Sequence, residues 1–326
     1  MTFDFYHKNT PHFISDIAET PVMQRLKNVG MNCGCEYTSF PRFSSIHSYS
    51  RFDHSLGAGL ITWHFTEDIC ASAAALLHDV ATPVFAHTVD FMNGDYILQE
   101  STESRTAGII SSSLELMSVL KRYGLTVEDV ADYHRYPIAD NNSPKLSSDR
   151  LEYTLGNVVN YCFADIDTIK RLYQEIVISR NEDGEPELAF SALKSAEEFA
   201  LYSINCSRIY ASPEDRYSMQ ILSELLSDAV NNSVITCDDL YTDEPTVISK
   251  LIGNEETKNK WEKFRSLSHM VSSKEYTEQS RVISAKKRRI DPLVNGQGRV
   301  SELSRVFREE LSDFLLEDFS IPIAAI

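Results

Sequence analysis

Residues 71–80 read Ala71-Ser-Ala-Ala-Ala-Leu-Leu-His-Asp-Val80, and this stretch decides the fold class of the chain. Alanine and leucine are strong helix formers, so the run favours a helix. The helix must end near Thr82-Pro83, because a residue that precedes proline avoids helical backbone angles. We therefore predict a helix over residues 68–79, with a histidine and an aspartate at its end.

Helical patterns continue on both sides of this stretch. Apolar residues recur at helical spacing in several further segments: residues 20–29, 53–66, 103–122, 126–134, 148–162, 165–174 and 191–230. One segment differs, because residues 175–179 alternate loosely, Asn181-Glu-Asp-Gly184 supplies turn residues and residues 187–190 can return as a second strand. We expect a mostly α-helical fold with a small β-hairpin. From Val234 onward the pattern is less regular.

The charge balance excludes several classes of function. The chain has 326 residues, and its 31 Lys and Arg against 48 Asp and Glu give a net charge of −17. Such a chain repels phosphate backbones and anionic lipid unless a local basic pocket focuses the field. We therefore expect no general nucleic-acid binding and no membrane-surface binding.

Targeting and cysteine patterns favour a cytoplasmic protein. No run approaches the roughly 18 apolar residues of a membrane span, and residues 1–10 contain no apolar stretch typical of a secretory signal. The six cysteines are scattered, which is typical of reduced thiols rather than of a disulfide framework. The one close pair, Cys33 and Cys35, has no second pair nearby, so we interpret it as packing residues rather than as a zinc site.

Two histidines and two aspartates carry the predicted chemistry: His54, His78, Asp79 and Asp149. Residues 54 and 78 are separated by one helix, a turn and most of a second helix, and two antiparallel helices joined in this way can bring both imidazoles together. Imidazole and carboxylate together suit one divalent ion such as Fe, Mn, Mg, Ni, Co or Zn. Taken singly, each histidine fits a hydrogen-bonded core or helix-end residue equally well.

The order of four motifs favours metal-binding histidines over core or helix-end histidines. They are Arg51-Phe-Asp-His-Ser-Leu-Gly57, Leu76-Leu-His-Asp-Val80, Pro83-Val-Phe-Ala-His87 and Asp149-Arg-Leu-Glu-Tyr153. The ordered set resembles the HD-domain metal-dependent phosphohydrolases, and most closely their deoxynucleoside-triphosphate triphosphohydrolase (dGTPase-like) branch. Thr20-Pro-Val-Met-Gln-Arg-Leu26, the hairpin near Gly184 and Lys287-Arg-Arg-Ile-Asp-Pro292 extend the resemblance to roughly residues 15–315.

The resemblance implies an HD-domain helical bundle with one divalent metal held by His54, His78, Asp79 and Asp149. We expect a metal-binding helical domain over residues 1–175. An α-rich C-terminal subdomain with the hairpin, residues 176–326, would pack on it. The resemblance also implies a homo-oligomer, although the sequence shows no coiled-coil seam of its own.

The same resemblance implies five substrate-binding residues: Arg51, Arg150, Tyr153, Asn157 and Tyr210. The two arginines would face phosphates, and Tyr153 would line a nucleotide site. Helical spacing agrees, because Asp149, Tyr153 and Asn157 share one helix face at intervals of four. Arg51 lies one turn before His54 and can hold a phosphate that the metal also touches.

Several positions depart from the pattern of that branch. Ala81-Thr82 replaces Gly-His, Thr102 replaces a histidine, and Tyr202 stands, in an ungapped alignment, where an arginine grips the terminal phosphate. Further departures are Asn157 in place of aspartate and Met31-Asn32 where a sugar-reading glutamine is absent. Threonine cannot act as an acid or a base near neutral pH. The pattern therefore keeps the metal ligands and loses part of the set that handles a triphosphate.

Three functions remain open from the sequence. The first is a metal-dependent phosphohydrolase acting on a nucleotide or related phosphoester, such as a nucleoside monophosphate. Asp79 and either His87 or Glu103, or alternatively Glu100, would then be its catalytic residues. The second is a dNTP triphosphohydrolase with the lost side chains replaced from elsewhere in the fold. The third is a catalytically degenerate nucleotide-binding regulatory protein. His87 fits a buried structural histidine as well as a catalytic one.

A basic run, Lys286-Lys-Arg-Arg289, lies near the end of the chain. It can contact a substrate or allosteric phosphate, or it can be a solvated face that balances the acidic surface. The second interpretation is slightly favoured by the sequence alone.

Overall fold

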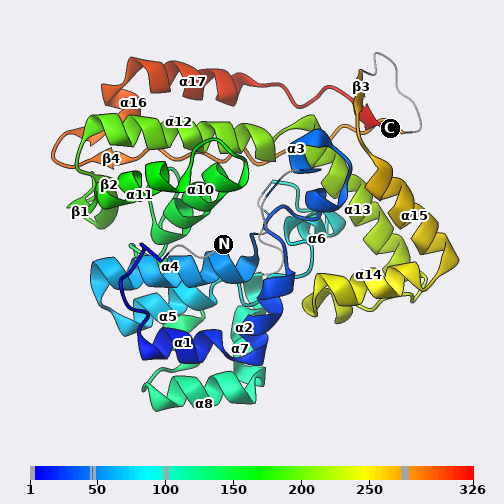
Figure 1. Cartoon of the computed structure of the whole chain (residues 1–326), viewed down its shortest axis with the longest axis horizontal. Helices are drawn as coiled ribbons and strands as arrows, with labels where there is room; N and C mark the ends of the chain where they lie inside the picture. Colours follow the sequence, from blue (N-terminus) through cyan, green and yellow to red (C-terminus); the bar gives the residue numbers. More distant parts are fainter. Residues whose placement is uncertain (1–3, 45, 47–48, 98, 100–102, 273–278) are drawn as a thin grey trace.

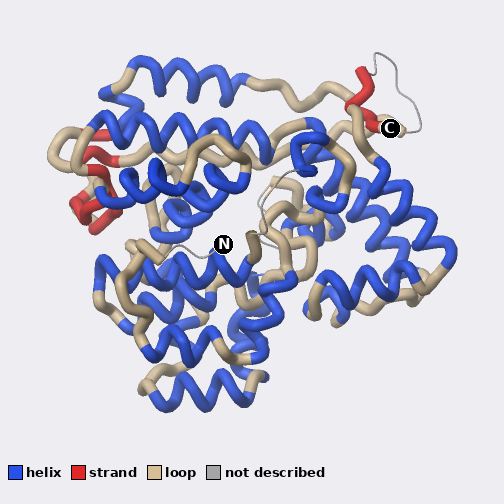
Figure 2. Tube along the Cα trace, in the orientation of Figure 1, coloured by secondary structure: helices blue, strands red, loops and turns tan. Residues whose placement is uncertain are grey.

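The computed structural model describes residues 4–44, 46, 49–97, 99, 103–272 and 279–326. Within these residues the chain forms seventeen α-helices, five short 3-10 helices and six short strands, which confirms the mostly α-helical fold. Figure 2 shows helices throughout and strands confined to two small areas at the edge of the molecule.

The helices of the first half are α1 His12–Ala18, α2 Pro21–Gln24, α3 Pro41–Ser44, α4 Arg51–Thr66, α5 Ile69–Leu77, α6 His87–Met92, α7 Thr106–Ser112, α8 Leu114–Arg122, α9 Val127–Val130, α10 Ser148–Asn160 and α11 Ile166–Gln174. Those of the second half are α12 Leu193–Tyr210, α13 Pro213–Asn231, α14 Glu244–Ile252, α15 Glu255–Ser266, α16 Val300–Leu303 and α17 Arg305–Leu316. The 3-10 helices are η1 Arg25–Asn28, η2 Cys35–Tyr37, η3 Glu103–Arg105, η4 Tyr133–Arg135 and η5 Asp239–Tyr241.

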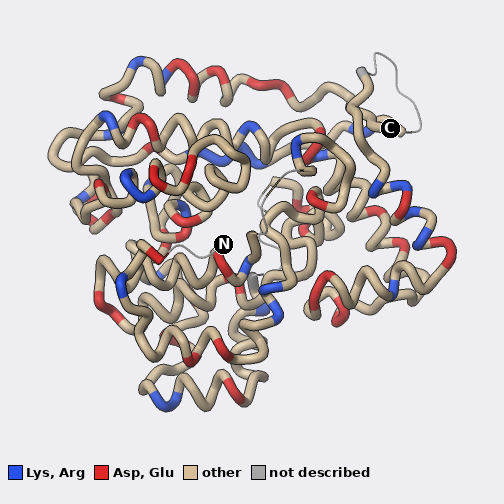
Figure 3. Tube along the Cα trace, viewed as in Figure 1, with Lys and Arg blue, Asp and Glu red and all other residues tan. Residues whose placement is uncertain are grey.

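These helices form three groups (Figure 1). Helices α1, α4, α5 and α8 form one group, and α10, α11, α12 and α17 lie above it in the view. Helices α13, α14 and α15 form the third group at the side, and α6 lies where the groups meet. Acidic and basic residues alternate over all three groups without a continuous basic band (Figure 3), in keeping with the acidic composition.

The predicted hairpin is confirmed. Strand β1 (Ile176–Arg180) pairs with β2 (Pro186–Phe190) in antiparallel register, with Ile176 opposite Phe190. Two further strands extend the sheet in the order β1-β2-β4-β5: β4 (Leu293–Val294), parallel to β2, and β5 (Gly298–Arg299). A separate pair joins β3 (Met270–Ser272) and β6 (Ile323–Ala325).

Helix boundaries differ from the sequence prediction where a cap interrupts the apolar pattern. The segment predicted at 191–230 is two helices, because Ser212 caps α13 and Pro213 occupies its first position. The segment at 103–122 is likewise divided, since the Ser113 side chain accepts a bond from the backbone N–H of Leu116 and begins α8. Helix α9 begins at a capping box between Thr126 and Asp129.

The region after Val234 is more helical than its pattern suggested. It contains α14 to α17, which are short and bury few side chains each. In α15, for example, only Thr257, Trp261 and Phe264 are buried. Their spacing of four and three residues is helical, but the charged residues between them hide the signal in the sequence.

Two clusters of buried apolar side chains hold the helices together. One includes Leu76 of α5, Leu155 of α10 and Phe307 of α17, and the other includes Phe85, Leu222 of α13 and Trp261 of α15. Both clusters draw residues from each side of position 175. The division into domains at that position stays a prediction. Among the described residues, no helix has the length and apolar character needed to cross a membrane.

Candidate metal centre and its cavity

The four predicted ligands lie at the ends of three helices that converge on one point. His54 is in the first turn of α4, Asp149 is in the first turn of α10, and His78 and Asp79 follow the last residue of α5. The start of α4 is fixed by a capping box between Ser50 and Asp53, and the start of α10 by the Ser147 side chain, which accepts from the N–H of Arg150. Local capping thus fixes the helix starts that carry His54 and Asp149.

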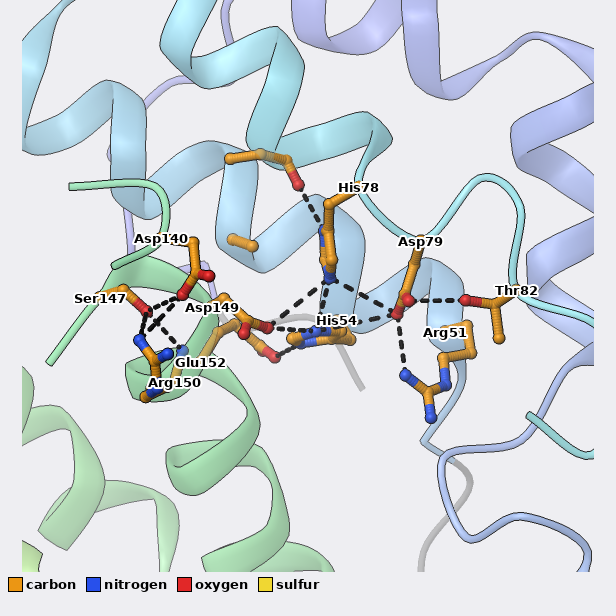
Figure 4. A network of polar contacts seen from close by, with 12 residues as sticks. Arg51, His54, His78, Asp79, Thr82, Asp140, Ser147, Asp149, Arg150 and Glu152 are labelled. Carbon is orange, nitrogen blue, oxygen red and sulfur yellow. Dashed lines mark hydrogen bonds and ion pairs between the residues drawn. The ribbon is translucent and has the colours of Figure 1, made fainter. Parts of the chain in front are cut away.

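The ligand atoms are close enough to share one ion. His54, His78 and Asp149 offer atoms that all lie within 4.8 Å of one another. The two Nε2 atoms are 3.1 Å apart, and Asp149 Oδ1 is 3.0 Å from His54 Nε2 and 3.6 Å from His78 Nε2. Asp79 approaches from the other side of the histidine pair (Figure 4), with Oδ2 3.6 Å from His78 Nε2 and 3.9 Å from His54 Nε2. We call these four residues the cage.

The orientation of each imidazole is set by its other nitrogen. His54 Nδ1 donates to Glu152 Oε2 at 2.6 Å, and His78 Nδ1 donates to the Ala75 carbonyl at 2.7 Å. The two Nε2 atoms are therefore left to face each other across 3.1 Å. When His54 is neutral, both can direct a lone pair at a cation between them, as metal-binding histidines do. Without a metal, a second proton on His54 Nε2 can bond to Asp149 Oδ1 instead.

Glu152 is a supporting residue that the sequence analysis did not single out. Its carboxylate is buried and also accepts from the hydroxyls of Tyr49 at 2.5 Å and Tyr6 at 3.3 Å. Two glycines make room for this network. A Cβ on Gly57 would lie 2.5 Å from Glu152 Cγ, and one on Gly156 would lie 2.3 Å from the Tyr49 hydroxyl. The signal for Glu152 was its place in the Asp149 motif, one helical turn after the ligand.

The electrostatics of the cage favour a bound cation. Burial opposes the charged form of His54, but its bonds to Asp149 and Glu152 raise the pKa of this imidazole to about 10. Burial would raise the pKa of Asp79 and of Asp149. Instead, the Arg51 guanidinium and the imidazoles hold the pKa of Asp79 well below its usual range, and the bond to His54 does the same for Asp149. Two imidazoles and two ionised carboxylates therefore fit one divalent ion.

Asp79 is held by two neighbours that the sequence analysis discussed separately. Arg51 Nη1 donates to its Oδ2 at 2.9 Å, and the Thr82 hydroxyl donates to its Oδ1 at 2.6 Å. Thr82, which stands where the related branch has a histidine, thus orients a ligand here. Arg51 is buried, and its Nε atom has no hydrogen-bond partner among the described residues. The same side chain lines the cavities beside the cage.

Two adjoining cavities open beside the cage, with volumes of about 490 and 330 Å³. Both are lined by Arg51, His78, Asp79 and His87, and the larger also by the predicted substrate-binding residues Arg150, Tyr153, Asn157 and Tyr210. Ligand pockets commonly measure roughly 300–1,000 Å³. The structure therefore brings the predicted ligands and substrate residues to one place.

Arg150 reaches the cavity, but protein atoms engage its guanidinium. Its Nη1 donates to Asp140 Oδ1 at 2.8 Å and to Asn141 Oδ1 at 2.9 Å, and its Nη2 donates to the Asn141 carbonyl (Figure 4 shows the Asp140 and Ser147 contacts). This side chain therefore braces the loop that precedes α10. A phosphate would have to compete with Asp140 for it.

One part of the larger cavity, which we call its neutral end, is lined by uncharged polar groups. Asn157 Nδ2 donates to the Tyr210 hydroxyl at 2.8 Å, and the Tyr161 hydroxyl donates to Asn32 Oδ1 at 2.9 Å. Asp215 also lines this end, and burial raises the pKa of its carboxyl to about 8. At neutral pH this end therefore carries amide, phenol and carboxylic acid groups rather than charges.

His87 faces both cavities from the first position of α6. Positive φ angles of 56° at Phe85 and 45° at Ala86 turn the chain just before it. Its Nδ1 donates to Asp90 Oδ2 at 3.0 Å, and its Nε2 accepts from Arg288 Nη2 at 3.2 Å. Burial, together with the charges of Arg288 and Arg51, lowers the pKa of His87 to about 4, so its imidazole is neutral at pH 7.

Three other sequence predictions have different outcomes. The side chain of Glu103 lies outside the described residues, as do Glu100 and Thr102. The described residues that line the cavities do not include Tyr202. Residues 285–288, which we call the strap, do line the larger cavity. The interpretation of the basic run as a solvated face is therefore wrong for Arg288, because the strap passes over the cavity and turns that side chain into it.

Comparisons with known proteins agree with this geometry at a coarse level. No known protein-family profile matches the chain. The uncharacterized protein YdhJ of Bacillus subtilis is 23% identical over 243 residues, which is 73% of this chain and 70% of that protein. The uncharacterized protein YwfO of the same organism is 25% identical over 66% of this chain and 52% of its own length.

A third relative carries a functional name. The metal-dependent phosphohydrolase cns2 of Cordyceps militaris is 22% identical over 149 residues, which is 45% of this chain and 40% of that protein. The fold is shared with a hypothetical protein from Aquifex aeolicus, with a TM-score of 0.65 and 17% identity over 97% of this chain and 93% of that one. The printed name of that relative specifies a metal-dependent phosphohydrolase, and the His-His-Asp cluster of this chain offers ligands that fit a divalent metal.

Proposed function

We propose that the protein is a metal-dependent phosphohydrolase that acts on a nucleotide or a related phosphoester. The observation that carries the proposal is the cage, in which both histidines have their Nδ1 hydrogens committed and direct Nε2 toward a common point between two carboxylates. A divalent ion held there would polarise a phosphoryl oxygen and lower the pKa of a bound water.

The surrounding residues suit a phosphate bound beside the cage. Arg51 has a buried Nε that points to no protein acceptor among the described residues, while its Nη1 is anchored on Asp79. This anchor fixes the guanidinium so that a phosphate oxygen can bond to it with little loss of side-chain entropy. His87, which is neutral at pH 7, offers a nitrogen at the same cavity that can accept a proton.

The neutral end of the cavity suits an organic leaving group. Asn32, Asn157 and the Tyr161 and Tyr210 hydroxyls provide donors and acceptors without charge, and Tyr153 adds an aromatic ring. A nucleoside presents complementary hydrogen-bonding edges and a flat surface. This match supports a nucleotide among possible phosphoesters.

The direct test combines metal analysis with a substrate panel. The purified protein should contain about one divalent ion per chain and should release orthophosphate from at least one nucleoside monophosphate or other phosphoester. Asp79→Ala should lose both properties. Asp313→Ala removes an exposed carboxylate on α17 and serves as the matched control. Hydrolysis that is equal in the two variants would refute the proposal.

Product analysis separates the remaining alternatives. A dNTP triphosphohydrolase would release intact tripolyphosphate, and the presence of Arg288 in the cavity favours this second candidate because it adds a cation where Tyr202 does not. A regulatory protein would bind a nucleotide with metal present and form no product over hours. Activity that appears on restoring histidine at positions 82 and 102 would support that reading.

A further inference from the structure

Arg288 reaches from the strap into the cavity and bonds to residues about two hundred positions earlier in the chain. Its Nη2 donates to Gln99 Oε1 at 2.6 Å and to His87 Nε2 at 3.2 Å. Both acceptors belong to the cavity wall next to the cage. The guanidinium therefore lies at the cavity beside the cage.

Both of these partners are uncharged. Gln99 offers an amide oxygen, and His87 is a neutral imidazole because its Nε2 accepts from Arg288 while Nδ1 carries the ring hydrogen donated to Asp90. Other arginines near the site bond to carboxylates, as Arg51 does to Asp79 and Arg150 to Asp140. An anion adds to the hydrogen bond a charge–charge attraction to the guanidinium that an uncharged partner does not supply. An anion that entered the cavity would therefore compete well for Arg288.

Contacts of the residues around Arg288 fix where its side chain points. Lys287 Nζ donates to the carbonyls of Leu315 at 2.7 Å and Glu317 at 2.6 Å, on the side of α17. The backbone N–H of Asp291 donates to the Pro144 carbonyl at 2.9 Å, and the Asp291 carboxylate accepts from Ser301. Because Lys287 is bonded toward α17 and Asp291 is bonded to Pro144 and Ser301, the backbone on each side of Arg288 is fixed and its side chain faces the cavity.

We propose that Arg288 binds the substrate phosphate beside the cage, exchanging Gln99 and His87 for phosphate oxygens. The inference rests on the proposed phosphohydrolase function and adds a specific phosphate-binding residue to it. It also accounts for Tyr202, because the cation that α12 lacks at that position comes from the strap instead. The exchange releases His87 Nε2, so phosphate binding leaves a free proton acceptor facing the same cavity.

The test measures the binding of inorganic phosphate to the metal-loaded full chain by calorimetry. Arg288→Met should weaken phosphate binding by about 10–100-fold, the effect of losing a hydrogen bond to a charged group. Arg288→Lys, which keeps the charge but loses the planar fork, should give an intermediate value. The control Arg305→Met removes the same charge from a side chain that is 80% exposed on α17 and should change the affinity less than about twofold.

A second readout follows His87 itself. In the Mg²⁺-loaded protein labelled with ¹⁵N-histidine, the Nε2 resonance of His87, assigned with His87→Gln, should shift when phosphate displaces Arg288. In Arg288→Met the resonance should already differ before phosphate is added. Melting temperature and metal content of each variant report whether the fold and the cage are intact, and Arg288→Lys carries the comparison if Arg288→Met does not fold.

The outcomes distinguish this inference from the proposed function. If wild-type protein binds phosphate and Arg288→Met and Arg288→Lys bind it as tightly, the role of Arg288 is refuted while the phosphohydrolase proposal stands. If metal-loaded wild-type protein binds no phosphate and hydrolyses no phosphoester, both fall. Weakened binding in Arg288→Met, with metal content unchanged, supports the inference.

Discussion

The cavity has one wall made of helix ends and another made of the extended strap, and the two are held differently. In the helix wall, caps within a few residues fix the starts of α4 and α10, which carry His54 and Asp149, and Glu152 holds His54 from a buried network. In the strap wall, Arg288 contacts a residue 201 positions away. Short stretches of sequence therefore determine how the helices present the ligands. Which residues line the opposite wall of the cavity depends instead on contacts between segments that are far apart in the chain.

Removing a ligand should have the largest effect on the helix wall. His78→Ala deletes the nitrogen that lies 3.1 Å from His54 Nε2, so the protein should lose its metal and its hydrolytic activity together. Metal content after dialysis, measured by elemental analysis, checks this. His269→Ala, an exposed histidine, is the control. Equal metal content in both variants would show that the helix wall is not a metal site.

Changing the support behind the ligand should have the next largest effect. Glu152→Gln keeps the shape of the side chain but removes the charged acceptor of His54 and two tyrosines. We expect metal affinity to fall by about 10–100-fold, as is typical when such outer partners are changed. Titration with a competing chelator gives the affinity. An unchanged affinity would mean that the ligands orient themselves without this network.

A methyl group added next to Glu152 tests the same support of the helix wall. Gly57→Ala puts a Cβ 2.5 Å from Glu152 Cγ, so the protein should lose roughly 1–3 kcal/mol of unfolding free energy and bind metal more weakly. Gly108→Ala, also in a helix, has nothing within 4 Å of the new Cβ and should stabilise the protein by up to about 1 kcal/mol. Urea denaturation measures both, and a gain for Gly57→Ala would contradict the crowding.

The smallest expected effect is the contribution of Asp215, which lines the neutral end of the larger cavity, to the pH dependence of protein stability. Burial raises the pKa of Asp215 to about 8, above its unfolded value of about 4, so its contribution to stability is present at low pH and is lost as pH rises through 8. Asp215→Asn should remove this loss, which is worth about 1 kcal/mol between pH 6 and 7. Denaturation at several pH values checks it, and parallel curves for the two proteins would contradict it.

His87 should act in the opposite direction. Its pKa is lowered to about 4 from an unfolded value near 6.5, so its contribution is present above pH 6.5 and is lost as pH falls through 4. The pH range of the two effects therefore separates them. A His87→Gln variant should change the acid side of the stability profile and leave the slope above pH 7 as it is in wild type.

Much of the fold followed from short patterns. The Ala71–Val80 stretch became α5 with His78 and Asp79 directly after it, and the turn at Asn181-Gly184 became the hairpin. Periodicity did not show where caps divide a long apolar pattern, as at Ser113 and Ser212, nor the helices of the C-terminal region. A single side-chain hydrogen bond decides such breaks, and apolar spacing does not record it.

The site was predictable to a similar degree. The four ligands and five substrate-binding residues of the sequence analysis meet around connected cavities, and their roles stay predictions until they are tested. Glu152 was within reach of sequence reasoning, since it lies one turn after Asp149. For Arg288 the sequence left two alternatives open, a phosphate contact and a solvated face, and Asp215 was not singled out, because short patterns do not show which distant segments line the cavity.

Lys287 and Arg288 together connect the end of α17 to the cavity. Lys287 is bound to carbonyls at the end of α17, while the next residue lies in the cavity. A displacement of that helix end by a few ångströms would be transmitted through a single peptide unit to the guanidinium beside His87. We therefore expect a ligand that binds the end of α17 to shift Arg288 as well, although it does not enter the cavity.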